Sequence, residues 1–182
     1  MMLLLAATLA HADPVALRAP SATHTLAVAN TSVSYAMWDR DRRWGVAFHV
    51  DDLGRGATGA WVGVRTEWRA PSGFGVDVHA AAGLLLLRGI DLGLGVTPAA
   101  AVGWRRPRFD ATLGLVAPLA FKFTHGPALS VPILLEPWVG VHLGAFTVGG
   151  GGAAGPVLSA GELFAVDLRW MLSVGWTPGG AK

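Results

Sequence analysis

The feature that most constrains this chain is a strict alternation of apolar residues with small or polar ones. From 90 to 104 every even-numbered residue is apolar, while the odd-numbered residues are small or polar. The same period of two runs through 74–86 and 109–123. Because successive side chains of a strand point to opposite faces, these segments predict β-strands with one apolar face and one small, charged face.

Composition separates the chain from an ordinary soluble domain. Hydrophobic residues make up 52% of its 182 residues, charged residues make up 14%, and the mean hydropathy is +0.47. Soluble domains carry about 25% charged residues, so the charged fraction of this chain is low for such a domain. Disordered chains are poor in apolar residues, so the high apolar fraction excludes disorder. An uncharged run long enough for a membrane helix, Pro137 to Gly161, holds eight glycines and Pro156, which would break the helix. We therefore expect strands to cross the bilayer.

Turn residues divide the chain into about eight expected strands: 24–38, 44–53, 57–69, 74–87, 90–104, 109–123, 129–147 and 157–176. The alternation of the first strand is interrupted at Asn30, which indicates a bulge. The glycine tract Gly149–Gly152 is expected to be a flexible outer loop. Unpaired backbone groups in lipid cost several kcal/mol each, so the sheet must close. The expected fold is all-β, a transmembrane up-and-down antiparallel β-barrel of about eight strands, in a monomer.

Aromatic residues gather near the ends of the expected strands, as they do at the two interfaces of membrane barrels. One girdle, beside the basic loops, is expected to contain Trp38, Trp44, Trp68, Phe74, Trp104 and Phe109. The opposite girdle is expected to contain Phe121, Phe123 and Trp176.

Over residues 24–176 the pattern resembles the small bacterial outer-membrane β-barrel proteins, a superfamily with OmpA-like, OmpX-like and OmpW-like barrels. The resemblance implies a Gram-negative outer membrane, contact with its lipids, and insertion by the barrel-assembly machinery. Such chains commonly finish on an aromatic residue that this machinery reads. Here Trp176 is followed by a tail, 177–182.

The N-terminal residues 1–12 are expected to be a signal peptide. Their apolar run closes on Ala10-His11-Ala12, which fits a signal-peptidase site, although a basic start is missing and the true start can lie upstream. Residues 13–23 are then an N-terminal periplasmic segment, before a barrel at 24–176. The absence of cysteine leaves both an oxidising and a reducing compartment open.

An eight-stranded barrel has little room for water, so inward charges should be paired. Simple hairpin registers predict four pairs: Arg65 with Asp77, Asp91 with Lys122, Asp110 with His142, and Glu136 with Arg169. Such a network can be a lumen plug or a gated path for protons or ions. The plug is favoured, because removing one partner of a buried pair costs about 3–5 kcal/mol and this alone accounts for retaining both.

Seven arginines are expected at one end of the barrel, in or beside its basic loops: Arg40, Arg42, Arg43, Arg69, Arg105, Arg106 and Arg108. They either contact lipopolysaccharide phosphates, which suit guanidinium groups, or form a solvated rim. The formal net charge of +2 is too small to predict nucleic-acid binding.

No catalytic, cofactor or metal site is predicted. His49, His79 and His142 share the inward face, but their spacing matches no metal motif. The glycine tract lacks the Gly-Lys-Ser/Thr ending of a phosphate-binding loop.

The expected function is a structural or surface barrel with a charge-plugged lumen and, at most, narrow permeability to small solutes. One alternative is a lipid A-modifying enzyme, for which His125, Ser130 and Glu136 are the nearest candidates for a triad. The other is a soluble lipocalin-like barrel that binds a ligand, in which the apolar faces would point inward.

Overall fold

The computed structural model describes residues 15–18, 22–30, 32–51, 57–87, 91–124, 128–159 and 162–178. These form one short helix and twelve strands: α2 (Val15–Arg18), β1 (His24–Ala29), β2 (Ser32–Trp38), β3 (Trp44–Asp51), β4 (Ala57–Arg69), β5 (Phe74–Leu87), β6 (Asp91–Arg105), β7 (Phe109–Val116), β8 (Leu119–Lys122), β9 (Ala128–Pro132), β10 (Leu134–Leu143), β11 (Phe146–Ser159) and β12 (Glu162–Trp176). The expected signal peptide, 1–12, lies outside the described residues.

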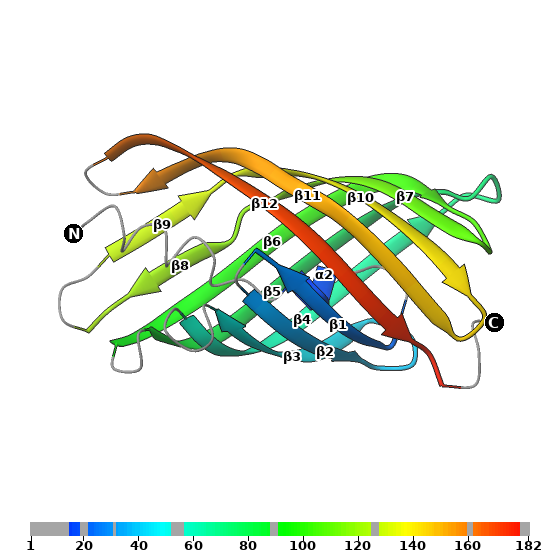
Figure 1. The fold of residues 1–182 in the computed structure, drawn as a ribbon, viewed down its shortest axis with the longest axis horizontal. Coiled ribbons are helices and arrows are strands. Elements are labelled where there is room, and N and C mark those ends of the chain that lie inside the picture. Colours follow the sequence, from blue (N-terminus) through cyan, green and yellow to red (C-terminus); the bar gives the residue numbers. More distant parts are fainter. Residues whose placement is uncertain are drawn as a thin grey trace.

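The strands form a closed antiparallel barrel (Figure 1). Ten strands make the ring, which runs from β1 through β7 to β10, β11 and β12, and the β1–β12 ladder returns it to its start. The two short strands β8 and β9 fill the gap between β6 and β11 at the other end. The prediction of an all-β antiparallel barrel is confirmed, and the expected number of eight strands is corrected to ten.

The first additional strand comes from the segment 24–38, which is a hairpin and not one bulged strand. Asn30 takes the left-handed conformation, with φ 46°, and the chain reverses so that Ala29 pairs with Ser32. The Asn30 side chain stabilises the turn against β12: its Oδ1 accepts from the Trp170 amide at 2.9 Å, and its Nδ2 donates to the Leu168 carbonyl at 3.1 Å. Asparagine adopts this conformation more readily than most residues, and this turn signal explains the interrupted alternation.

The second additional strand contains the glycine tract. Gly149–Gly152 lies inside β11, paired with β10 on one side and β12 on the other, and is not a loop. The chain instead turns at Gly144, whose φ is +65°. Glycine is unusual in strands because it has no side chain to pack, so it commonly marks a close approach of other groups.

Tryptophan side chains provide that close approach inside the barrel. Trp61 and Trp138 are 2% and 6% exposed and fill the lumen. A Cβ built on Gly149 would lie 2.6 Å from the Trp138 ring, and one on Gly95 would overlap the Trp61 ring outright. Inward glycines therefore make the space in which the indole rings lie.

The outer face of the barrel is apolar, as the alternation predicts. Leu92, Leu94 and Leu115 are 50%, 47% and 55% exposed, whereas Asp91, Lys122 and other charged side chains are buried in the lumen. The polarity of an ordinary globular protein is thus inverted.

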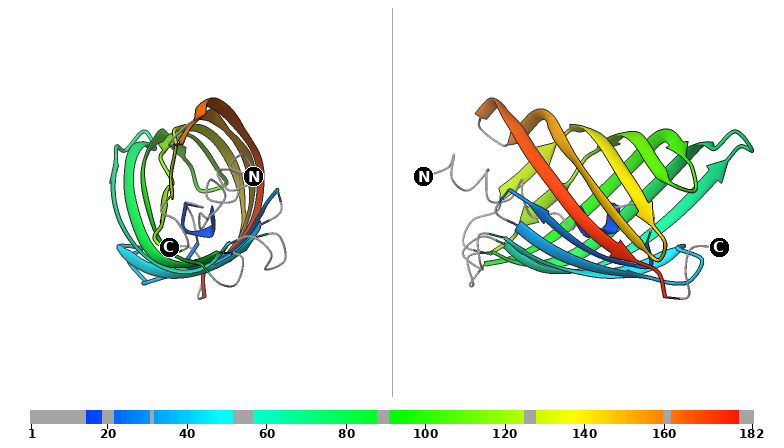
Figure 2. Two further views of the ribbon diagram at one scale, coloured as in Figure 1. Left: turned by 90° about the vertical axis from the view of Figure 1, so that its left-hand side faces the viewer. Right: turned by 45° about the vertical axis from the view of Figure 1, so that its right-hand side comes forward.

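Helix α2 lies inside the ring of strands (Figure 2, left). Val15, Ala16 and Leu17 are at most 3% exposed, and the Ala16 amide donates to Ser34 Oγ of β2 at 2.9 Å. The segment 13–23 was expected to be a periplasmic extension ahead of the barrel, but its described helical part occupies the lumen. Within the described parts of the chain, no helix is long and apolar enough to cross a membrane.

Both chain ends of the barrel lie beside the basic loops. His24, at the start of β1, pairs with Trp176 at the end of β12 and with Met37 near the end of β2, just before the loop 39–43. The eight-strand interpretation placed the basic loops at the end opposite to the two chain ends of the barrel. It did not include the β1–β2 hairpin, which adds one reversal of the chain. Trp176 consequently belongs to the end that carries the basic loops. Trp38 points inward and is only 5% exposed, so it is not part of a girdle.

We expect Gly95→Ala to lower the free energy of unfolding by about 1–3 kcal/mol, because the added methyl group must displace the Trp61 ring from a filled lumen. Gly114→Ala is the matched control, since its Cβ would meet its nearest neighbours at an ordinary 3.5 Å. Urea unfolding of the refolded protein in detergent measures both. Equal unfolding midpoints for the two variants would contradict the role given to the glycines.

Candidate functional site

Three charge pairs expected from the sequence are in direct contact in the lumen. The contacts are Arg65 Nε to Asp77 Oδ1 at 3.0 Å, Lys122 Nζ to Asp91 Oδ2 at 3.3 Å, and His142 Nε2 to Asp110 Oδ2 at 3.2 Å. The two residues of each pair were expected directly opposite one another on neighbouring strands. The registers in the structure differ from the expected ones by two residues, so that Arg65, for example, lies opposite His79. A shift of two residues keeps every side chain on its face, and diagonal neighbours remain within reach of long side chains.

The fourth pair, Glu136 with Arg169, was expected on neighbouring strands. Strand β11 lies between β10 and β12, so the two residues are one strand further apart than predicted. Glu136 Oε2 lies 2.8 Å from Arg18 Nη2 of α2, and Arg169 Nη2 lies 2.5 Å from Asp167 Oδ2 on its own strand. The carboxylate of Glu136 thereby ties the internal helix to the barrel wall.

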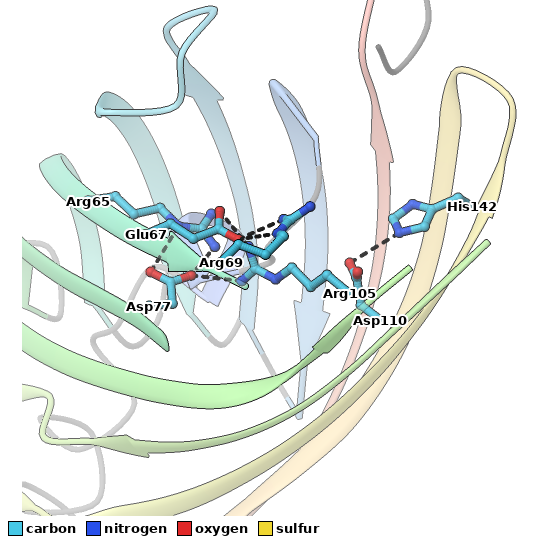
Figure 3. Close-up of polar contacts among 7 residues, drawn as sticks. All are labelled: Arg65, Glu67, Arg69, Asp77, Arg105, Asp110 and His142. Atoms are coloured by element: carbon cyan, nitrogen blue, oxygen red, sulfur yellow. Dashed lines mark hydrogen bonds and ion pairs between the residues drawn. The ribbon is translucent and has the colours of Figure 1, made fainter. Parts of the chain in front are cut away.

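The densest group of charges is the arginine cluster, defined as Arg65, Glu67, Arg69, Asp77 and Arg105 (Figure 3). It spans β4, β5 and β6. Arg105 bridges both carboxylates, with Nη1 at 2.9 Å from Glu67 Oε2 and Nη2 at 2.8 Å from Asp77 Oδ2. Arg69 Nη2 lies 2.6 Å from Glu67 Oε1. Three cations share two carboxylates, so the cluster carries one surplus positive charge.

The cluster extends from the interior to the mouth of the barrel. The side chains of Arg65 and Arg105 are 4% and 8% exposed, while that of Arg69 is 43% exposed. Arg105 was expected at the rim, but it points inward because it falls on the inward parity of β6. Glu67 was not among the predicted site residues, although it shares the inward parity of Arg65, two residues earlier in β4.

The loop between β2 and β3 carries three of the expected rim arginines: Arg40, Arg42 and Arg43. Asp39 organises it, since its Oδ1 accepts from the Arg43 amide at 2.6 Å and the Trp44 amide at 2.9 Å. The Arg42 amide donates to the Asp39 carbonyl at 2.9 Å, and Arg42 itself is left-handed, with φ 57°. Arg106 and Arg108, in the β6–β7 connection, are exposed at the same end.

Two cavities adjoin the cluster. An inner one, beside α2, has a volume of about 40 Å³ and is lined by residues that include Arg18, His79, Glu136 and Trp138. This is room for only roughly two or three water molecules. An outer one of about 520 Å³ opens at the mouth, between the loop 39–43 and β4.

The remaining candidates for chemistry do not assemble. His49 and His79 are buried, and His142 also lies 3.0 Å from Thr147 Oγ1 through its Nδ1. Among the described residues, no three His, Asp or Glu side chains gather as metal ligands would. For the alternative triad, Ser130 is fully buried on β9, and His125 lies outside the described residues.

Comparisons with protein-family models, with curated proteins and with solved structures found no match. The described residues themselves define the class: a closed antiparallel β-barrel with an apolar exterior and a filled, charged lumen. Its candidate functional regions are the charged lumen and the arginine-bearing mouth.

We expect Asp77→Asn to destabilise the barrel by about 3–5 kcal/mol, because it leaves Arg65 and Arg105 close together with one carboxylate fewer. Combining it with Arg65→Gln should restore part of this loss, since the cluster then returns to one surplus positive charge, with Glu67 shared by Arg69 and Arg105. A double-mutant cycle of urea unfolding measures the coupling. If the two changes were additive, Arg65 and Asp77 would not be energetic partners.

Proposed function

We propose that this protein is an exported outer-membrane β-barrel with a structural or surface role, whose lumen is closed by paired charges, tryptophans and an internal helix. The observation that carries the proposal is the inverted polarity of the barrel. Among the described residues, thirty-seven large hydrophobic side chains are exposed around its outside, while the buried charged side chains face the lumen. Monomeric soluble proteins rarely expose contiguous apolar patches larger than a few hundred Å².

Dimensions and aromatic residues support a bilayer as the surrounding medium. Strands β4, β5, β6, β11 and β12 have 13 to 15 residues, and about 9–11 residues suffice to cross a bilayer. Exposed aromatic side chains at the end with the basic loops are Trp44, Trp68, Trp104, Phe109 and Phe146, and those at the other end include Phe121 and Phe123. Such belts lie at the headgroup level of membrane barrels.

The alternative of a soluble lipocalin-like barrel requires the opposite arrangement. Its apolar residues would line an internal ligand cavity, but Leu92, Leu94 and Leu115 point outward. Among the described residues the lumen instead contains the indole rings of Trp38, Trp61 and Trp138, and the inner cavity beside α2 has a volume of only about 40 Å³.

The alternative of a lipid-modifying enzyme lacks an exposed nucleophile among the described candidates. Ser130 is fully buried, and Glu136 is engaged by Arg18. A triad would need both groups within reach of a lipid substrate at the rim.

The topology also bears on the expected contact with lipopolysaccharide. The start of β1, the end of β12 and the arginine-bearing mouth share one end. If the segment before β1 begins on the periplasmic side, as export predicts, this mouth faces the periplasm. The arrangement therefore favours a solvated or ligand-binding mouth over contact with lipopolysaccharide in the outer leaflet.

Placing an arginine on the outer face tests the membrane proposal. Val96, in the middle of β6, and Val102, two residues from Trp104, are 44% and 45% exposed. In phosphatidylcholine vesicles, Val96→Arg should cost about 2–4 kcal/mol and Val102→Arg about 0–1 kcal/mol, because the penalty falls toward the interface. Reversible unfolding by guanidinium measures both. Equal small effects, or a native protein that is soluble without detergent, would contradict the proposal.

Planar-bilayer recordings test the closed lumen. The native protein should be silent, because α2 and the tryptophans fill the lumen. Arg18→Gln should produce discrete openings, since it removes the ion pair between the internal helix and Glu136 of the barrel wall. Arg40→Gln, an exposed change of the same charge, is the control and should stay silent. Steady conductance of the native protein would refute the plug.

A further inference from the structure

The outer cavity exists because two neighbouring strands end at different heights. The β3–β4 ladder stops where Trp44 pairs with Val64, and the last backbone contact is the Arg65 amide donating to the Arg43 carbonyl at 2.8 Å. Strand β4 continues to Arg69, paired only with β5. The projecting β4–β5 hairpin is the teal turn at the upper right of Figure 1. The resulting notch, about 520 Å³ in volume, is of the size that holds a small organic ligand.

The notch is positively charged. Its lining includes the guanidinium groups of four arginines, against the carboxylates of two acids: Arg42, Arg43, Arg65 and Arg69, with Asp41 and Glu67. Arginines therefore outnumber carboxylates in the lining even though Arg65 is paired with Asp77 of the cluster, and this positive surplus suits an anion. Glu67 is shared with Arg69 and Arg105, and Arg65 with Asp77, so the inner part of this lining is held in place by the arginine cluster.

The wider surroundings reinforce this charge. Among the described residues, eight arginines lie at this end of the barrel. They are Arg40, Arg42, Arg43, Arg65, Arg69, Arg105, Arg106 and Arg108. Five described carboxylates accompany them: Asp39, Asp41, Glu67, Asp77 and Asp110. Such a one-signed field raises the local concentration of anions at the mouth.

The backbone of Arg42 closes the β2–β3 hairpin in the left-handed conformation. Its φ of 57° is a conformation in which glycine or asparagine would be at lower energy. Short hairpin loops commonly use such a residue, and Asp39 holds this loop in shape through the amides of Arg43 and Trp44. Because Arg42 also lines the notch, the ordered loop fixes the backbone from which its side chain extends.

We propose that the notch binds a phosphate-bearing anion, a phosphomonoester attached to a small polar or lipid group. Converging guanidinium groups suit the oxygen atoms of such a dianion through bidentate, charge-assisted hydrogen bonds. The strand residues beside the notch, Trp44 and Trp68, are 56% and 61% exposed on the outer face. If the protein spans a membrane as proposed above, these rings place the notch at the depth of lipid headgroups. Binding of a soluble phosphomonoester does not depend on that proposal.

Two ligands distinguish the sources of the phosphate. The refolded full chain in a nonionic detergent is titrated with glycerol 3-phosphate by calorimetry. In a second experiment, the unfolding midpoint of the chain in phosphatidylcholine vesicles is measured with and without phosphatidic acid. We expect saturable binding to at least one of these, weakened as NaCl rises from about 50 to about 500 mM. Binding of glycerol 3-phosphate identifies a soluble ligand class, and a response to phosphatidic acid alone identifies the lipid headgroup.

Three variants locate the binding. Arg43→Gln and Arg42→Gly should each weaken the affinity by about tenfold, the loss of one charge-assisted contact. Arg42→Gly should leave the unfolding midpoint no lower than that of the native chain, because glycine accepts the left-handed backbone. Arg40→Gln, in the same loop but outside the notch, is the matched control and should bind normally.

An equal loss in Arg40→Gln would mean that diffuse charge attracts the anion, which overturns the assigned site. Absence of binding by the folded native chain to either ligand would also overturn it. Either result leaves the membrane proposal intact, because that proposal is tested by unfolding in vesicles and by conductance.

Discussion

Closure of the sheet is the constraint on which the rest of the structure depends. Once β10 pairs with β11 and β12 pairs with β1, the ring has no free edge along these ladders. Every side chain on a strand must then point either into a narrow lumen or outward. The alternation of the sequence assigns the charged and small residues to the lumen, so the interior must be filled and neutralised by the chain itself.

Two kinds of contact meet this demand. Trp61 and Trp138 supply volume, and glycines beneath their rings, Gly95 and Gly149 among them, supply the space. Ion pairs supply neutralisation, and several of them link neighbouring strands. The same pairing also fixes α2, because Arg18 of the internal helix meets Glu136 of the wall. The packing of the lumen and the pairing of its charges therefore depend on each other.

The charges are not neutralised evenly along the barrel. In the arginine cluster three guanidinium groups share two carboxylates, and the loop ordered by Asp39 adds Arg42 and Arg43 just outside it. The buried part stabilises the wall, while the exposed part creates an electropositive notch. A structural ion-pair network and a candidate ligand site thus share Arg65 and Glu67.

The sequence by itself determined which face most residues of the long strands take, because a period of two is a local property of the backbone. This was sufficient for the antiparallel barrel, for the outward leucines and for the contacts of Arg65 with Asp77 and Lys122 with Asp91. It was insufficient for the number of strands, because the turn at Asn30 resembles a bulge and a glycine tract resembles a loop. Only the tertiary structure decided the registers, the role of Glu67 and Arg105, the place of α2 in the lumen and the end on which the arginines gather. These depend on how many times the chain reverses and on which strands meet at closure, and both are set by contacts between residues far apart in the sequence.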